Sequence, residues 1–406
     1  MSLMQQLTGR ARHRFPGSRP AAHRGVAVTA VCAAAALAVA ACGSSSGGSS
    51  ASGKSSPITI GISVPLSGSV GSSCGPMDQG MLAWFNHVNA TGGIHGQKIK
   101  VDNRDDAYQA AESVTNTRAF IAEHVVAVTG QCGSIQPPAQ IPLLDAAKIP
   151  YLFVFGSCLP CNADPEYFNL MPDYGLQLQQ MVPWVFQHKG KGSVVIMTSS
   201  TPGAAQITSN VESAVKQAGG SFLAGYNVPP GTADMTPYVL KMKNLHPDYV
   251  ILNMTPQDAA VVTKAMGSQN FAPTKALVGS AAISQATFLT NVPPSLLPKV
   301  IVSSDVIPPA SAGGTQCSKV LTAAKIEVSS VTLRGCGTAQ VDTAVMMQAG
   351  SPVTSAGIVK ALEGWKKKKV SEIYPALTFS QSNHVGVSAL YLFGVKNNQF
   401  VVIGQL

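Results

Sequence analysis

The sequence predicts an α/β protein with two doubly wound, mostly parallel sheet lobes. Short apolar runs alternate with amphipathic stretches of helical length, and such runs are typical of strands that helices cover on both faces. The alternation continues to about residue 370. The 350 residues that follow residue 56 (406 − 56) exceed what one hydrophobic core usually takes, so two lobes are expected.

The start of the chain predicts export. Residues 1–41 contain five arginines and no acidic residue, and they end in the apolar run 26–41. At about 1.5 Å per residue, this run of sixteen spans about 24 Å, which is short of the roughly 30 Å bilayer core. The pattern therefore favours a secretory signal peptide over a permanent membrane span.

The end of that segment predicts a lipid anchor. Val39-Ala40-Ala41-Cys42 resembles the lipobox of bacterial lipoproteins, in which the cysteine is lipidated and becomes the new N-terminus. An ordinary cleaved signal that happens to contain a cysteine is the alternative. Residues 42–56 are mostly Gly and Ser, and this composition behaves as a flexible coil. We therefore expect a tether between a lipidated Cys42 and the folded body.

Nine short strands are expected in the body, and most of them are continuous apolar runs. They cover residues 58–64, 98–103, 125–130, 151–155, 193–199, 221–227, 249–254, 275–279 and 299–304. The C-terminal part has no helix signal. Its last two apolar stretches flank Asn397-Asn398, a pair that favours the tight turn of a β-hairpin.

Three of the helical stretches between the strands are clearest. The stretch 77–93 ends in two glycines, which stop a helix, and 107–124 has apolar residues at helical spacing. The stretch 232–246 is expected to begin at Asp234 as its N-cap, with Pro237 in the first turn.

Charge and cysteine content limit the possible functions. Without the five signal arginines the net charge falls from +9 to +4 (9 − 5), which is too mild to argue for nucleic-acid binding. Besides Cys32 and Cys42, six cysteines remain, and an even number in an exported chain favours disulfides. We expect Cys317 to pair with Cys336, since they flank one helical segment. Three pairings stay open for the other four, Cys74, Cys132, Cys158 and Cys161.

A resemblance to a known family begins at residues 88–114, "VNATGGIHGQKIKVDNRDDAYQAAESV". These residues are similar to the leucine/isoleucine/valine-binding family of extracytoplasmic solute-binding proteins, type I periplasmic binding proteins that serve ABC importers. The family's motif positions hold Asn89, Gly92, Gly93, Ile94, Gly96, Lys98, Ile99, Asp105 and Asp106. The likeness continues through "IGISVPLSG", "VAVTGQCGS" and "LTFSQSNHVGVSALYLFGVKNNQFVV", and covers nearly all of 57–403.

The resemblance implies two lobes joined by a hinge of three crossings. The first lobe would comprise 57–172 plus 306–373, and the second 173–305 plus 374–406. It also implies a function without catalysis or cofactor. A monomer would capture a small polar solute (an amino acid, an amide or a small carboxylate) by lobe closure, outside the cell, and deliver it to an ABC-transporter permease.

The ligand is expected beyond the carboxyl ends of the strands, as in other open parallel sheets. There the loops 65–76, 130–136, 156–162, 199–206 and 254–259 are rich in Ser, Thr, Gly and Gln, which offer hydrogen bonds without an unpaired charge. The candidate ligand-binding residues are Cys74, Ser134, Gly156, Ser157, Cys158, Thr255, Gln257 and Asp258. The resemblance assigns Ser134 and 156–158 to the carboxylate of an amino acid; for the two serines, ordinary turn chemistry is the alternative.

Departures from the family's pattern affect the expected solute. Its amino-acid binders pair the ligand ammonium with a glutamate at the position where this sequence has Gln257, and a neutral amide does not match a buried ammonium. The family's two pocket aromatics fall near Pro202 and Cys74. A neutral amide, or a carboxylate without an amine, is thus expected as readily as an amino acid. If Asp258 turned inward, an amine would fit again.

The sequence also allows alternatives to solute delivery. A ligand-sensing receptor of the same fold is one. Cys158-Leu-Pro-Cys161 is a C-x-x-C motif that suggests a thiol–disulfide redox protein, but thioredoxin-like chains are much shorter. A zinc site formed by Cys132, Cys158 and Cys161 lacks a fourth ligand.

Overall fold

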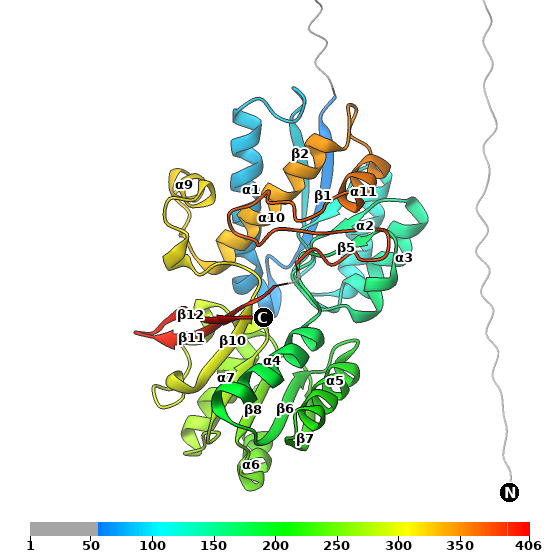
Figure 1. Cartoon of the computed structure of the whole chain (residues 1–406). Helices are drawn as coiled ribbons and strands as arrows, with labels where there is room; N and C mark the ends of the chain where they lie inside the picture. The colour runs from blue at the N-terminus through cyan, green and yellow to red at the C-terminus, as the bar shows by residue number, and fades with distance from the viewer. Residues whose placement is uncertain (1–55, 388) are drawn as a thin grey trace, which may run out of the picture. The chain divides into compact units, whose positions relative to one another are not determined.

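The structure, a computed structural model, describes residues 56–387 and 389–406 (Figure 1). The predicted signal peptide, Cys42 and almost all of the predicted tether lie outside the described residues. Within the described ranges, no helix combines the length and the apolar character that crossing a membrane requires.

The first sheet has five parallel strands in the order β2-β1-β3-β4-β5. Its strands are β1 (Ile58–Val64), β2 (Ile99–Asp105), β3 (Val128–Thr129), β4 (Tyr151–Leu152) and β5 (Tyr167–Phe168). β1 is buried along almost its whole length, as expected for an apolar strand covered on both faces. β3, β4 and β5 are only two residues long, so this sheet has few ladder hydrogen bonds near β5.

The second sheet has seven strands in the order β12-β11-β10-β9-β8-β6-β7. They are β6 (Ser193–Ser199), β7 (Ser221–Val228), β8 (Tyr249–Asn253), β9 (Ala276–Gly279), β10 (Val300–Ser304), β11 (Tyr391–Lys396) and β12 (Gln399–Gln405). All pairs are parallel except those of the C-terminal hairpin. The predicted hairpin turn is confirmed, because Asn397 and Asn398 both have left-handed φ angles, of 52° and 57°. The predicted class with two mostly parallel sheets is likewise confirmed.

Helices flank both sheets. They are α1 (Gly71–Ala90), α2 (Ala110–Ala122), α3 (Pro137–Ala147), α4 (Tyr174–Lys189), α5 (Ala204–Gln217), α6 (Thr236–Leu245), α7 (Pro256–Ser268), α8 (Ala286–Leu289), α9 (Gln316–Ala323), α10 (Ser330–Gln348) and α11 (Ser355–Glu363). Short 3₁₀ helices are η1 (Gly68–Val70), η2 (Leu159–Ala163), η3 (Ala281–Ile283), η4 (Leu297–Lys299) and η5 (Pro309–Ser311). α10 starts at a capping box formed by Ser329 and Thr332, and it packs along α1 although the two helices are far apart in sequence (Figure 1).

The chain passes between the two sheets three times. It crosses after β5, after β10 and again before β11, because α9 and α10 pack on α1 of the first-sheet side. The first and third crossings run side by side: the Asn169 N–H donates to the His384 carbonyl (2.8 Å), and the Gly386 N–H donates to the Asn169 carbonyl (2.8 Å). The lobe boundaries expected at 172, 305 and 373 remain a prediction.

Some expected boundaries were wrong. α1 begins at Gly71 instead of residue 77, because packing against α10 keeps the turns around Pro76 helical. The strands expected at 125–130 and 151–155 have only two residues each in the structure. β5 was not expected, because it is too short to show any periodicity. α6 has Met235 at its N-cap, whereas the carboxylate of the expected cap, Asp234, accepts the Thr236 N–H (2.9 Å).

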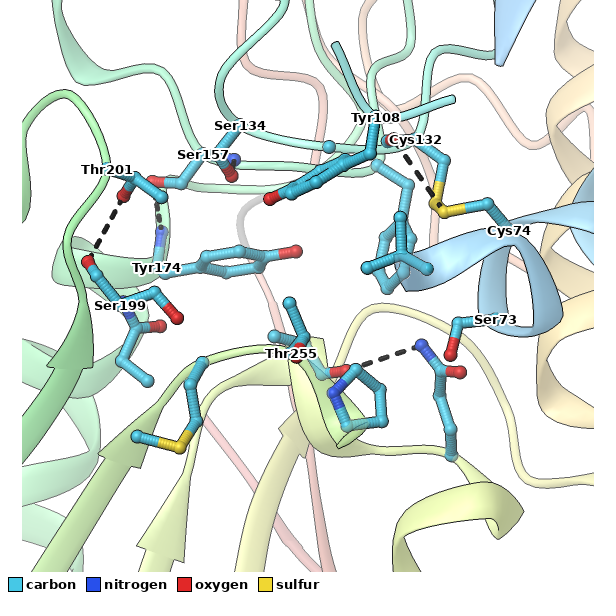
Figure 2. A pocket seen from close by; sticks show the side chains of 18 of the residues that line it. Ser73, Cys74, Tyr108, Cys132, Ser134, Ser157, Tyr174, Ser199, Thr201 and Thr255 are labelled. Carbon is cyan, nitrogen blue, oxygen red and sulfur yellow. Dashed lines mark hydrogen bonds between the residues drawn. A yellow bond between two sulfur atoms is a disulfide. The ribbon is translucent and has the colours of Figure 1, made fainter. Parts of the chain in front are cut away.

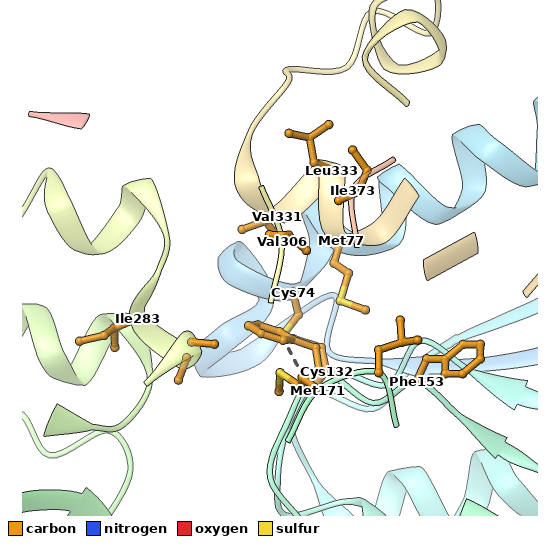
Figure 3. Packing of buried hydrophobic residues seen from close by; sticks show 14 of the residues in the cluster. Cys74, Met77, Cys132, Phe153, Met171, Ile283, Val306, Val331, Leu333 and Ile373 are labelled. Carbon is orange, nitrogen blue, oxygen red and sulfur yellow. Dashed lines mark hydrogen bonds between the residues drawn. A yellow bond between two sulfur atoms is a disulfide. The ribbon is translucent and has the colours of Figure 1, made fainter. Parts of the chain in front are cut away.

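Three disulfides cross-link the described residues. Cys317 pairs with Cys336 as predicted, but the bond joins α9 to α10, since both cysteines lie inside helices. The other four cysteines, for which three pairings stayed open, form the disulfides Cys74–Cys132 and Cys158–Cys161. The Cys74–Cys132 bond lies within the main apolar core, close to Met77 and Met171 (Figure 3).

Candidate functional site

A pocket of about 70 Å³ lies where the carboxyl ends of strands from both sheets meet. Its first-sheet wall consists of the lining residues between 70 and 157, which follow β1, β2, β3 and β4. Its second-sheet wall consists of those between 199 and 285, which end or follow β6, β8 and β9, and Tyr174 stands between the walls. This is the position that parallel sheets predict for a ligand.

The pocket has no charged side chain among the described residues that line it. Apolar side chains such as Phe155, Ile207 and Met254 alternate with hydroxyl groups. The pocket can therefore surround an apolar group and hydrogen-bond a polar one, but it offers no formal countercharge.

The first-sheet wall is braced by covalent and polar links. The Cys74–Cys132 disulfide joins α1 to the loop after β3. The Ser157 N–H donates to the Ser134 Oγ (2.8 Å), which holds the loops after β3 and β4 together. The Ser157 hydroxyl donates to the buried carboxylate of Asp173, the N-cap of α4. Burial raises the pKa of that carboxyl group, and the hydrogen bond from Ser157 opposes the rise.

Two tyrosines place their hydroxyls in the middle of the pocket (Figure 2). Tyr108 has a left-handed φ of 60°, and its N–H donates to the Asp106 carboxylate (3.0 Å). Burial raises the pKa of the Tyr108 phenol to about 12, and the nearby charge of Asp258 adds to the rise. Burial likewise raises the pKa of Tyr174. Both side chains are thus neutral phenols at physiological pH.

The second-sheet wall uses most of its polar groups internally. The Asn253 amide donates to Thr198 (3.0 Å) and accepts from Ser280 (2.8 Å). Thr255 caps α7, and its Oγ1 accepts the Asp258 N–H (3.1 Å). One buried acceptor of this wall is left over: Gln285 is 2% exposed, and its Oε1 has no hydrogen-bond partner among the described residues. That oxygen is a buried acceptor without a partner in the wall of the pocket.

Gln257 connects the two walls. Its Nε2 donates to the hydroxyls of Ser72 (3.2 Å) and Ser73 (2.7 Å) in the first turn of α1. Its neighbour Asp258 accepts the Gly231 N–H (3.0 Å), which fixes the loop after β7. Both side chains line a second cavity, of about 180 Å³, beside the first pocket.

The sequence profile of the periplasmic binding protein family matches residues 57–399. The chain belongs to that family. It is 21% identical over 348 residues to the Leu/Ile/Val-binding protein homolog 3 of Brucella melitensis biotype 1, which covers 83% of this chain and 90% of the relative.

Solved structures share the fold of this periplasmic binding protein. A branched-chain amino acid ABC transporter protein from Thermus thermophilus with bound valine has a TM-score of 0.77 at 13% identity, covering 87% of this chain and 96% of the other. A fatty acid ABC transporter substrate-binding protein from Thermomonospora curvata has a TM-score of 0.75 at 17% identity, covering 86% and 91%. These similarities support the type I periplasmic binding protein fold.

The eight candidate residues divide into two groups. Cys74, Ser134, Ser157 and Thr255 line the pocket of this binding protein, whereas Gly156, Cys158, Gln257 and Asp258 do not. Gly156 instead allows a close backbone approach, because a Cβ there would collide with the Gly133 carbonyl. A binding role for each candidate remains a prediction.

Sequence reasoning missed both pocket tyrosines. Tyr108 lies two residues after the paired acids at the end of β2, and Tyr174 opens α4 after the first crossing. Each is therefore a loop or helix-start residue beyond a strand of the first sheet, and that position is the signal that could have identified it.

The C-x-x-C cysteines lie outside the pocket. Cys158 and Cys161 form a disulfide, are 3% and 4% exposed, and pack in a cluster with Tyr151 and Tyr167. Reactive thiols are usually partly exposed, so this burial does not favour redox catalysis. Cys132 is bonded to Cys74, so none of the three sulfurs considered for zinc is a free thiolate in this structure.

Proposed function

We propose that this periplasmic binding protein captures a small polar solute in the pocket between its two sheets. The single observation that carries the proposal is that both sheets contribute lining residues from their carboxyl ends to one pocket. A solute bound there touches both walls, so it favours the closed arrangement over the open one. No bond is made or broken in this function.

Closure by hinge bending is the proposed mechanism of capture. The contact of Gln257 with Ser72 and Ser73 supports it, because these hydrogen bonds span the two walls and form only when the walls approach. Small-angle scattering should show a smaller radius of gyration after ligand addition. Gln257→Ala should weaken ligand binding, whereas Gln217→Ala, at an exposed position on α5, should not. An unchanged scattering profile with a bound ligand would contradict closure.

Solute binding itself is tested by a thermal-shift screen of amino acids, amides, urea-like compounds and short carboxylates. A bound solute stabilises the folded state and raises the melting temperature. Ser134→Ala should reduce the shift, because the Ser134 hydroxyl holds the Ser157 amide at the pocket. Ser268→Ala, on the exposed surface of α7, is the control. If no solute in the screen causes a shift, the proposed function fails.

We further propose that lipidated Cys42 anchors the protein on the outer face of the cell membrane beside an ABC importer. The lipobox-like 39–42 and the Gly/Ser-rich 43–56 support this, since a flexible tether keeps the protein concentrated at the membrane surface. Mass spectrometry of the mature protein should find acyl chains on Cys42, and Cys42→Ser should release it into the soluble fraction. A mature N-terminus at any other residue would contradict the anchor. Ligand-dependent ATP hydrolysis by the importer in proteoliposomes would test delivery.

A further inference from the structure

The pocket presents hydroxyl donors that the protein itself does not use. Six hydroxyls line it without donating to any described residue: those of Ser73, Tyr108, Ser134, Tyr174, Ser199 and Thr255. Three of them already accept a hydrogen bond: Ser134 from the Ser157 N–H, Thr255 from the Asp258 N–H, and Ser73 from the Gln257 amide. Their O–H groups are therefore left to bind an acceptor on a ligand.

Three helices begin at the same pocket. α1 starts at Gly71, α4 at Tyr174 and α7 at Pro256, and the pocket is lined by Val70, Tyr174 and Thr255 at or next to these starts. Helix N-termini carry partial positive charge, which favours a negatively charged group near them. Together with the hydroxyl donors, they favour an anionic head group over a neutral one.

An ammonium group has no comparable partner in the pocket. The buried carboxylates nearby are those of Asp106, Asp173 and Asp258, and none of them lines it. All three already accept hydrogen bonds from the protein. The Gln285 Oε1 is one free neutral acceptor, whereas an ammonium carries three donors. An ammonium buried without a carboxylate partner is an unpaired ion, and its burial would cost on the order of several kcal/mol.

The rest of the pocket suits an apolar body. Val70, Phe155, Ile207, Met254 and Ala282 contribute side chains from both walls. We infer that the pocket binds a small monocarboxylate that has an apolar body and no ammonium group, an inference that rests on the proposed solute-binding function. Free α-amino acids of the same shape are then poor ligands.

Four compounds that share an isobutyl body test the head group. Calorimetry at pH 7.5 would compare 3-methylbutanoate, 3-methylbutanamide, valine and 2-methylpropylamine, and the same four head groups on a phenylalanine skeleton would cover a larger body. The carboxylate should bind at least tenfold more tightly than the amino acid, with the amide between them and the amine weakest. A valine or phenylalanine affinity that equals or exceeds that of the matching carboxylate overturns the inference and leaves the proposed function intact.

A result without binding is equally informative. If neither series binds, the ligand found in the wider thermal-shift screen decides: an amine-free carboxylate supports the inference, and any other head group overturns it. A screen without any ligand contradicts the proposed function itself.

Two variants test whether the carboxylate occupies this pocket. Tyr174→Phe removes one free hydroxyl and should weaken carboxylate binding about tenfold, the effect of losing a hydrogen bond to a charged group. Tyr226→Phe makes the same change in β7, outside the pocket, and should leave the affinity unchanged. Gln285→Glu adds a negative charge at the free acceptor and should reverse the preference towards the amino acid. Carboxylate affinities that do not change in Tyr174→Phe and Gln285→Glu would overturn the assignment to this pocket.

Discussion

The two sheets of this binding protein are held together by different means. In the first sheet, β3, β4 and β5 have two residues each, and all three disulfides of the described residues lie on its side. In the second sheet, β6, β7 and β12 have seven or eight residues, and no disulfide joins its described residues. The first sheet keeps a seven-residue ladder between β1 and β2, and cross-links and buried polar bonds supplement its short strands β3, β4 and β5. Substitutions should therefore act differently on the two sides.

The largest effect is expected at the buried ion pair between α10 and the second crossing. Arg334 is 1% exposed, its Nη2 lies 2.6 Å from the Asp305 carboxylate, and its guanidinium lies over the Phe155 ring. Arg334→Met leaves a buried carboxylate without its partner and should lower the free energy of unfolding by about 3–5 kcal/mol.

The matched control for Arg334 is Arg104→Met. Arg104 also pairs with acids, Asp102 and Glu123, and also lies near a phenyl ring, but its side chain is 34% exposed. Its loss should cost less than about 1 kcal/mol. Urea unfolding of both variants measures the difference, and equal losses would show that the buried pair is not a major cross-link.

The next effect concerns the disulfides of the first-sheet wall. Cys74–Cys132 spans 58 residues, whereas Cys158–Cys161 spans three. If chain entropy dominates, replacing the first pair with serines should cost about 4 kcal/mol and the second pair about 2 kcal/mol. Chemical denaturation of the two double variants would decide. A larger loss of unfolding free energy on removal of the Cys158–Cys161 disulfide would contradict the entropic account. It would indicate that packing around Cys158 contributes more than chain entropy.

A smaller effect with a defined pH dependence is expected at Asp78 of α1. Burial raises the pKa of Asp78 to about 6, and the hydrogen bond from Asn103 opposes the rise. The Oδ1 atoms of both residues lack a hydrogen-bond partner among the described residues, and a proton or an amide at position 78 can satisfy them. Because the pKa is raised, this group's contribution to stability is complete below about pH 4 and is lost as the pH rises through about 6.

At pH 8, Asp78→Asn should therefore raise the free energy of unfolding by up to about 3 kcal/mol relative to the natural protein. At pH 4 it should bring no such gain. The control is Asp248 on the second-sheet side, whose contribution to stability depends on pH in the opposite direction. Hydrogen bonds from Thr274 and Ser193 lower the pKa of Asp248, so its contribution is present at neutral pH and is lost on acidification. Asp248→Asn should destabilise at pH 8. Urea midpoints at both pH values test the pair, and parallel pH profiles would contradict it.

The sequence predicted the longer elements and the edge of the sheets that carries the pocket, because apolar runs and loop composition are local signals. Ser134 and Ser157 were assigned from the resemblance to the binding-protein family, and both lie in loops that follow strands and line the pocket. The Cys74–Cys132 pairing and the contact of Gln257 with Ser73 were not predicted, because each depends on which segments the fold brings together. The length of α1 was also missed, since packing on α10 outweighed the helix-breaking tendency of Pro76.

The smallest effect is expected at the edge of the second sheet, in the hairpin β11–β12. Ladder hydrogen bonds and the buried side chains of Leu392 and Phe393 hold this hairpin, without a disulfide among the described residues. Asn398 has a left-handed φ of 57°, which costs about 1–2 kcal/mol for a residue such as alanine. Asn398→Ala should therefore weaken the hairpin by about 1 kcal/mol, and Asn398→Gly should restore it, because glycine adopts this conformation freely. Hydrogen exchange of the β11 amides measures the local opening. If alanine opened both sheets equally, the hairpin would be coupled to the cross-linked side, and the contrast between the two sheets would not extend to this edge.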